Sequence, residues 1–356
     1  MADLTDISDE PTRLANIIGS VFAGQSKNWS TRLSGGEEVE LKVGADAQDD
    51  CAVFHLDGQQ DIVLGSDYVR GAKFMLYELG HLNEYDVGYY LAMANFSDIA
   101  AMGANPIALL SVIRYPRTMT DDTFRAVING INDACDRVGA PNVGGDIGTA
   151  ERLILSGAAV GVIESGRALL RSGARPGDRL CVTGYTGIAA AAQKYFGVLK
   201  PEGASVEDEK ERLLLSSWQR PLARIQEGRC LSTSGCVTSC QDTSDGLKAT
   251  IESISTSSNV GFVVDERAIP VSDLVAAVSA LPGAPPTADL IFGDSVDFQL
   301  TFTVQPTELE RLRQMFRGTG LSFHEIGWAT EDPAVLLRRA SGAMETLPGS
   351  PWRHNI

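Results

Sequence analysis

The stretch Asn95-Phe-Ser-Asp-Ile-Ala-Ala-Met-Gly-Ala-Asn-Pro106 places one carboxylate, Asp98, in a run of small and apolar residues. Upstream, Asn83 can cap a helix, and Gly103 is a typical C-terminal stop. Asp98 shares one face of this predicted helix with Val87, Leu91, Ala94 and Ala101. We therefore expect Asp98 to face the core, where an ionised carboxylate must be paired, hydrogen-bonded or bound to a metal.

Size and composition restrict the class of protein. With 356 residues, the chain is long enough for two domains, and 44% hydrophobic with 21% charged residues is typical of a soluble globular protein. The net charge of −16 disfavours a nucleic-acid partner. Because the start of the chain is acidic and no apolar run is long enough to span a membrane, we expect no membrane partner, no secretory signal and a cytoplasmic location.

The six cysteines are scattered without a Cys-x-x-Cys pair, and the chain has four histidines. This pattern disfavours a zinc site and indicates reduced thiols used as small core residues.

Strands that alternate with helices predict an α/β fold of two domains. We divide the chain into a lead-in at 1–40 with an amphipathic helix near 12–22, an N-terminal domain at 41–165 and a C-terminal domain at 166–356. The turn-rich segment 167–178 is the predicted junction. The main predicted strands are 61–69, 106–115, 153–163, 179–183, 237–241, 261–265, 297–304 and 323–328. The main predicted helices are 121–138, 207–217, 221–231, 271–280 and 307–317, with another that begins at 248.

Acidic residues recur at the ends of the predicted elements: Asp49, Asp50, Asp67, Asp98, Asp146, Asp242 and Asp245. Each one alone could serve a turn, a cap or a solvated edge. If they converge, bound cations must offset their mutual repulsion, and Mg²⁺ suits such oxygen ligands together with phosphate. Gly145 and Arg171 could then contact a polyphosphate. Neither a Walker loop nor a dinucleotide fingerprint is present.

Together these motifs resemble thiamine-monophosphate kinase, in the superfamily of aminoimidazole ribonucleotide synthetase and selenophosphate synthetase. The resemblance covers about residues 45–330. It rests on Asp49-Asp50-Cys-Ala-Val, Ser66-Asp67, the 95–106 stretch, Val143-Gly-Gly-Asp146, Arg171-Ser-Gly-Ala-Arg-Pro-Gly-Asp178 and Asp242-Thr-Ser-Asp-Gly-Leu247. It implies a two-domain α/β (α+β) fold of the aminoimidazole ribonucleotide synthetase type. The N-terminal sheet would pair across a homodimer, and a C-terminal mixed sheet with helices would close over the nucleotide.

The resemblance also implies roles for individual residues, with ATP and Mg²⁺ as cofactors. Its metal ligands correspond to Asp49, Ser66, Asp67, Asp98, Asp146, Asp242 and Asp245, of which Asp49, Asp98 and Asp245 are the expected catalytic residues. Its ATP contacts correspond to Gly145, Asp146, Arg171 and Ser244.

The sequence departs from the family at the acceptor side of the site. Lys73 stands where the family has a substrate-contacting His, Val296 replaces a substrate-contacting Glu, and Gly65 replaces a hydroxyl residue. Lys73 and Arg70 could hold an anionic acceptor or could be solvated loop charges. Trp352 could stack on the substrate or could simply pack.

Three functions remain open from the sequence. The first is ATP- and Mg²⁺-dependent phosphoryl transfer to thiamine monophosphate. The second is a superfamily paralogue that uses ATP to activate another small molecule, such as an amide, in a specialised pathway. The third is an inactive nucleotide-binding dimer.

Overall fold

The computed structural model describes residues 21–33, 35–56, 58–69 and 75–350. Most of the predicted N-terminal helix lies outside the described residues, as do Arg70, Lys73 and Trp352. The described chain forms two units, each built on a seven-stranded mixed sheet with helices, which confirms the predicted fold class.

The N-terminal sheet has the strand order β1-β2-β3-β4-β7-β5-β6. Its strands are β1 (Ser30–Arg32), β2 (Glu38–Val43), β3 (Ala52–Leu56), β4 (Gln60–Val69), β5 (Asn105–Tyr115), β6 (Asn142–Thr149) and β7 (Ile154–Glu164). All neighbours pair antiparallel except β5 and β6, which are parallel. The sheet therefore begins inside the segment 1–40 that we predicted to be a lead-in.

Helix α5 (Glu84–Ala101) is the element that positions Asp98. Its start is a capping box: Asn83 Oδ1 accepts from the Asp86 amide at 3.1 Å, and Asp86 Oδ2 accepts from the Asn83 amide at 3.0 Å. Gly103, at φ +72°, follows its end, as predicted.

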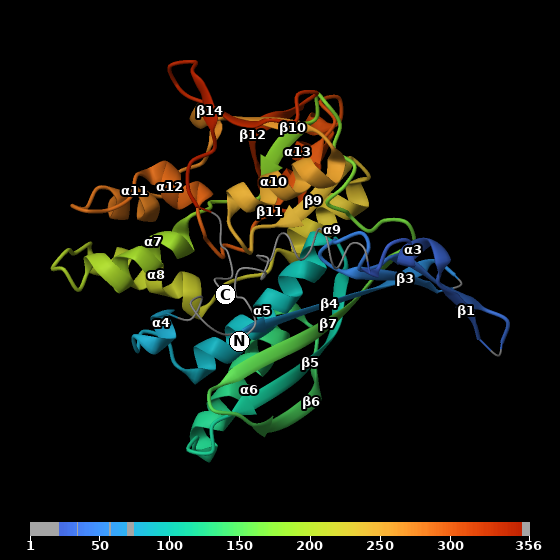
Figure 1. Cartoon of the computed structure of the whole chain (residues 1–356), viewed down its shortest axis with the longest axis horizontal. Helices are drawn as coiled ribbons and strands as arrows, with labels where there is room; N and C mark the ends of the chain where they lie inside the picture. Colours follow the sequence, from blue (N-terminus) through green and yellow to red (C-terminus); the bar gives the residue numbers. More distant parts are fainter. Residues whose placement is uncertain (1–20, 34, 57, 70–74, 351–356) are drawn as a thin grey trace, which may run out of the picture.

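Almost every side chain of α5 is buried because the helix lies between the two units (Figure 1). One side packs on β4, β7 and α6 (Asp121–Val138), and the other meets α8, α9 and β9 of the C-terminal unit. The run of small and apolar residues around Asp98 is explained by this packing, because a helix buried on both sides needs apolar residues all around it.

The C-terminal sheet has the order β14-β13-β10-β12-β8-β11-β9. Its strands are β8 (Arg179–Val182), β9 (Val237–Asp242), β10 (Gly261–Asp265), β11 (Leu300–Val304), β12 (His324–Thr330), β13 (Val335–Arg338) and β14 (Met344–Thr346). The helices of this unit are α7 (Ile188–Lys194), η4 (Tyr195–Leu199), α8 (Asp208–Gln219), α9 (Ile225–Ser234), α10 (Leu247–Ser258), η5 (Glu266–Ala268), α11 (Asp273–Ser279), α12 (Thr287–Phe292) and α13 (Leu309–Gly318). Short helices α3 (Gln25–Asn28) and α4 (Met75–Glu78) belong to the first part of the chain.

Two local predictions were wrong. The segment around Gly144 and Gly145, for which we predicted no strand, is strand β6 at the edge of the N-terminal sheet. The predicted strand 297–304 begins only at Leu300, because Asp297 accepts from the amides of Gly187 at 2.6 Å and Ala189 at 3.0 Å and so caps α7.

All six cysteines are buried free thiols. Among the described residues, no helix is long and apolar enough to cross a membrane.

Candidate active site: a buried carboxylate cluster

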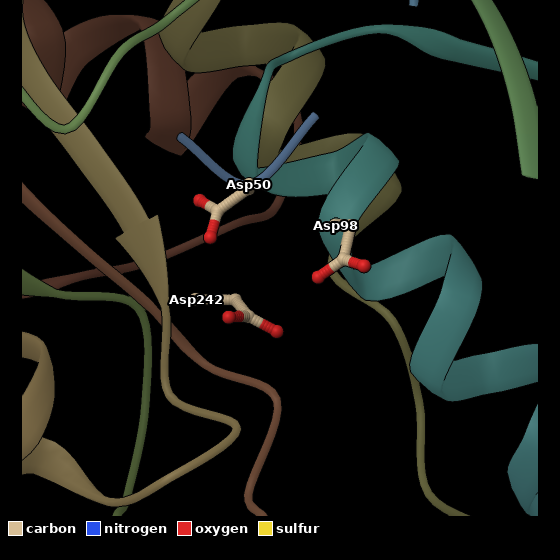
Figure 2. A group of neighbouring side chains, drawn as sticks. All are labelled: Asp50, Asp98 and Asp242. Atoms are coloured by element: carbon tan, nitrogen blue, oxygen red, sulfur yellow. The ribbon is translucent and has the colours of Figure 1, made fainter. Parts of the chain in front are cut away.

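Three carboxylates from distant parts of the chain meet between the two units. They are Asp50, just before β3, Asp98 in the last turn of α5, and Asp242 at the end of β9. One oxygen of each lies within 4.8 Å of the others, and Figure 2 shows the three side chains converging on a common space. We call this group the carboxylate cluster. The predicted convergence of Asp98 and Asp242 is present, and Asp50 joins them where the prediction had chosen Asp49.

Arg171 binds one side of Asp50. Its Nε donates to Asp50 Oδ1 at 3.1 Å, its Nη2 donates to the same oxygen, and its Nη1 donates to the Gln48 carbonyl at 3.0 Å. The other oxygen, Asp50 Oδ2, is buried and has no hydrogen-bond partner among the described residues. A buried carboxylate oxygen without a donor is costly, and a bound cation would satisfy this atom.

Asp49 is held by the main chain. Its Oδ2 accepts from the Arg171 amide at 3.2 Å, and its Oδ1 accepts from the Asp50 amide at 3.0 Å. Asp49 therefore ties the loop before β3 to the junction at Arg171.

Asp242 receives two hydroxyl hydrogen bonds. Ser244 Oγ donates to Oδ1 at 3.1 Å from the loop that follows β9, and Ser97 Oγ donates to Oδ2 from α5. Ser97 and Asp242 are 0% and 1% exposed, so water does not compete for this bond.

The cluster resists ionisation as a group. Burial, followed by the charges of Asp242 and Asp50, raises the pKa of Asp98 well above its ordinary value. Burial and Asp50 raise the pKa of Asp242 to about 7, although Ser97, Ser244 and Arg171 oppose the rise. Burial also raises the pKa of Asp50 despite its ion pair with Arg171. Repulsion of this kind is what a bound cation relieves.

Two further predicted acids lie near the cluster. The charge of Asp67 contributes to the raised pKa of Asp98, and that of Asp245 to the raised pKa of Asp50. The main chain at Asp67 is fixed by α5, because its amide donates to Asn95 Oδ1 at 3.0 Å. Ser66 lies differently: it is exposed, and strand alternation places its side chain on the face of β4 opposite to Gly65 and Asp67.

Gly145 and Asp146 lie apart from the cluster. Asp146 is exposed on the edge strand β6, where Arg114 Nη2 donates to it at 2.7 Å. Three strand spacings, about 14 Å, separate β6 from β4. Gly145 is required for close strand packing, since an added Cβ would lie 1.8 Å from the Ser111 carbonyl oxygen at φ +148°.

Two of the positions at which the sequence departs from the family, Val296 and Gly65, are described by the structure. Val296 is 3% exposed and belongs to the hydrophobic core. At Gly65, an added Cβ would lie 2.7 Å from Cys51 Sγ, so the thiol fills the space of a side chain at position 65.

A cavity of about 510 Å³ lies between helices of the C-terminal unit and Met75 of α4. Its apolar lining includes Met75, Val198 and Leu290, and its polar lining includes Lys194, Asp289 and Asp294. Gly349 and Ser350 close one side, immediately before the segment that contains Trp352.

Two residues of the site, Ser97 and Asn95, escaped prediction from the sequence, and Asp50 was named among the acids but was not assigned as a ligand. Asp50 was visible as the second member of an acidic pair. Asn95 and Ser97 were visible as polar residues in the same small-residue run as Asp98, at positions that a helix buries.

Comparison with known proteins agrees with this architecture. The model of the AIR synthase related protein N-terminal domain matches residues 48–163, and that of the C-terminal domain matches residues 175–338. Thiamine-monophosphate kinase of Pyrococcus horikoshii is 33% identical over 76% of this chain and 79% of its own. That of Bacillus subtilis is 32% identical over 82% of this chain and 86% of its own.

A solved structure described as "AaThiL complexed with AMPPCP and TMP" superposes with a TM-score of 0.72 at 25% identity, covering 86% of this chain and 91% of that one. The two-sheet fold is thus shared with this solved structure along most of the chain. The chain belongs to the thiamine-monophosphate kinase family, within the AIR synthase related proteins, and the prediction of a kinase family is confirmed.

Proposed function

We propose that this protein transfers the γ-phosphoryl group of ATP to thiamine monophosphate and forms ADP and thiamine diphosphate. The observation that carries the proposal is the carboxylate cluster of Asp50, Asp98 and Asp242, found in a chain of this kinase family. The related structure complexed with AMPPCP and TMP supports both the nucleotide and the acceptor.

The cluster fits a divalent cation. It offers only carboxylate oxygens, the donors that Mg²⁺ prefers, and Asp50 Oδ2 has no other partner among the described residues. Asp50, Asp98 and Asp242 would hold the metal, with Asp67 and Asp245 close enough to add negative charge. The roles predicted for Asp49 and Asp146 as ligands, and for Gly145, Arg171 and Ser244 as ATP contacts, remain proposals.

The protein's own contribution to the reaction is positioning and charge. Bound Mg²⁺ would offset the negative charge on the phosphate oxygens of ATP. Arg171 holds Asp50 in place, and the buried helix α5 carries Asp98 into the cluster. Because the acceptor is a phosphate and already anionic, it needs little help from a general base, and no covalent protein intermediate is required.

The cavity beside Asp294 supports a small-molecule acceptor. Its volume of about 510 Å³ falls in the range of about 300–1,000 Å³ usual for ligand pockets. Its lining includes the carboxylates of Asp289 and Asp294, which suit a positively charged heteroaromatic ring such as the thiazolium of thiamine, and Lys194, which suits a phosphate.

One observation favours a different acceptor. Val296 stands in the core, where the family has a substrate-contacting Glu, so the acceptor side is rebuilt. A paralogue that phosphorylates an amide or another small molecule is therefore the second candidate. An inactive nucleotide-binding dimer is the third.

Measuring ADP release with Mg²⁺, with and without thiamine monophosphate, separates the three. We expect ADP only when thiamine monophosphate is present. ADP formed only with other acceptors supports the second candidate, and ATP binding without ADP under all conditions supports the third.

We also propose a homodimer formed through the N-terminal sheet. The face opposite α5 exposes apolar side chains on β4 and β5, including Leu64, Tyr68, Ile107 and Leu110. Sedimentation velocity should show a dimer for the unmodified chain and a monomer for Leu110→Glu. The free buried thiols are consistent with the reducing cytoplasm, which we keep as the proposed location.

A further inference from the structure

The hydrogen bond between Ser97 and Asp242 joins the two units of the molecule at the carboxylate cluster. Ser97 belongs to α5, and Asp242 ends β9 of the C-terminal sheet, 145 positions later in the chain. Both side chains are buried, at 0% and 1% exposure. A hydrogen bond in this position could do no more than satisfy a buried carboxylate. It could also orient that carboxylate for binding a cation.

The orientation of Asp242 decides what its oxygens can reach. Ser244 donates to Oδ1 from the same loop, and Ser97 donates to Oδ2 from across the interface. Two donors on different oxygens prevent the carboxylate from rotating about its Cβ–Cγ bond. Each carboxylate oxygen keeps a second lone pair, which remains available to a cation.

Ser97 lies in the same turn of α5 as a member of the carboxylate cluster. Ser97 directly precedes Asp98, which contributes its own oxygen to the cluster. One turn of α5 thus supplies one ligand oxygen and orients another. Asp50 and Asp98 each come from the N-terminal unit, so Ser97 sets where the third carboxylate, from the other unit, stands relative to them.

We propose that Ser97 is a positioning residue that holds Asp242 in the orientation required to bind a divalent cation. Groups that orient metal ligands in this way typically change metal affinity by about 10–100-fold when they are removed. The inference rests on the metal site of the proposed function and does not depend on which acceptor is used.

Mn²⁺ binding to the full-length protein tests the proposal without nucleotide or acceptor. The free ion is measured by electron paramagnetic resonance, and the midpoint of thermal unfolding is measured for every variant. Ser97→Ala should weaken Mn²⁺ binding by about tenfold or more. Ser97→Thr keeps the hydroxyl and should retain affinity close to the unmodified protein, even though its added methyl group lowers stability in a fully buried position.

Ser232→Ala is the matched control. Ser232 is also a buried helical serine, 2% exposed, and its Oγ donates to the Arg167 carbonyl at 2.9 Å, away from the cluster. Its removal should lower stability without changing Mn²⁺ affinity.

Equal affinities for Ser97→Ala and the unmodified protein would overturn the proposal. So would a loss in Ser97→Ala that Ser97→Thr does not recover, or an equal loss in Ser232→Ala, because either result would indicate a general loss of packing. Absence of Mn²⁺ binding in the unmodified protein would overturn both this inference and the metal site. Failure of thiamine monophosphate as acceptor would overturn only the proposed reaction.

Discussion

Among single residues, Asp98 differs from the other two members of the carboxylate cluster. Asp50 accepts from Arg171, and Asp242 accepts from two serines, but no described residue donates a hydrogen bond to the Asp98 carboxylate. Its raised pKa reflects burial and the repulsion of neighbouring carboxylates, which the charge of Arg171 offsets only in part. Such a group destabilises the empty site and gains most from a cation.

We expect Asp98→Asn to lower Mg²⁺-dependent ATP turnover by about 100-fold or more, because a charged ligand is lost. The same change should raise the midpoint of thermal unfolding without metal, since the folded protein no longer has to bury an acid whose ionised form is disfavoured there. Steady-state ADP release and thermal unfolding in EDTA check the two parts. Activity near that of the unmodified protein would exclude Asp98 as a ligand.

Gly65 and Cys51 should behave as a coupled pair. Gly65→Ser alone should lower the free energy of unfolding by about 1–3 kcal/mol, because its Cβ would lie 2.7 Å from Cys51 Sγ. Adding Cys51→Ala frees that space, so the double variant should be more stable than Gly65→Ser alone. Denaturant unfolding of both variants measures the coupling.

Gly318→Ser is the comparison for this pair, because an added Cβ at Gly318 meets no atom within 4 Å. If Gly65→Ser costs no more than Gly318→Ser, the thiol does not fill the site as we describe.

The chemistry of the site was more predictable than its geometry. Asp98 and Asp242 could be predicted because acids in apolar or strand-end contexts require partners. The choice between Asp49 and Asp50 could not, because neighbouring side chains in a loop point in directions set by distant contacts, here the Arg171 amide and guanidinium. The exposed position of Ser66 follows from strand alternation, which motif matching ignored.

Among the elements of the described chain, α5 has the most complete N-terminal cap, a reciprocal capping box between Asn83 and Asp86. Asn83→Ala removes the acceptor for the Asp86 amide and should lower the free energy of unfolding by about 1 kcal/mol. Thr120→Ala removes the corresponding cap of α6, where Thr120 accepts from the Thr123 amide at 3.2 Å, and should cost a similar amount.

Chemical denaturation of both variants provides the measurement. A loss from Asn83→Ala far below that from Thr120→Ala would contradict the importance we give to the capping box of α5.

Elements with strong local signals matched their predictions closely. Helix α6 spans Asp121–Val138, as its apolar period and flanking Thr120 and Gly139 predict. Strand β6 was missed because glycines remove the side-chain alternation that identifies a strand, and its pairing with β5 depends on close backbone contact at Gly145.

At the scale of the whole molecule, the cluster couples stability to pH. Asp242 has a pKa of about 7 in the folded state against an ordinary value of 3.8, and Asp49 is also raised to about 7 by burial and Asp50. The folded protein therefore holds more protons than the unfolded chain between about pH 4 and pH 7. This contribution to stability is present at low pH and is lost as pH rises through about 7.

Without metal, the contribution of the carboxylate cluster should thus lower the midpoint of thermal unfolding as pH rises from 5 to 8. Added Mg²⁺ or Mn²⁺ should raise the midpoint more at pH 8 than at pH 5, because metal competes with protons for the same oxygens. Scanning calorimetry with EDTA or metal at both pH values checks this. A metal-induced shift that is larger at pH 5 would contradict the assignment, and Asp98→Asn should reduce the shift at pH 8.

The position of Asp242 has a consequence for the newly made chain on the ribosome. When only the first 165 residues have been synthesised, Asp50 and Asp98 are present, but the third carboxylate and the arginine that binds Asp50 are still unmade. A prematurely terminated product that ends before Asp242 therefore cannot assemble the cluster.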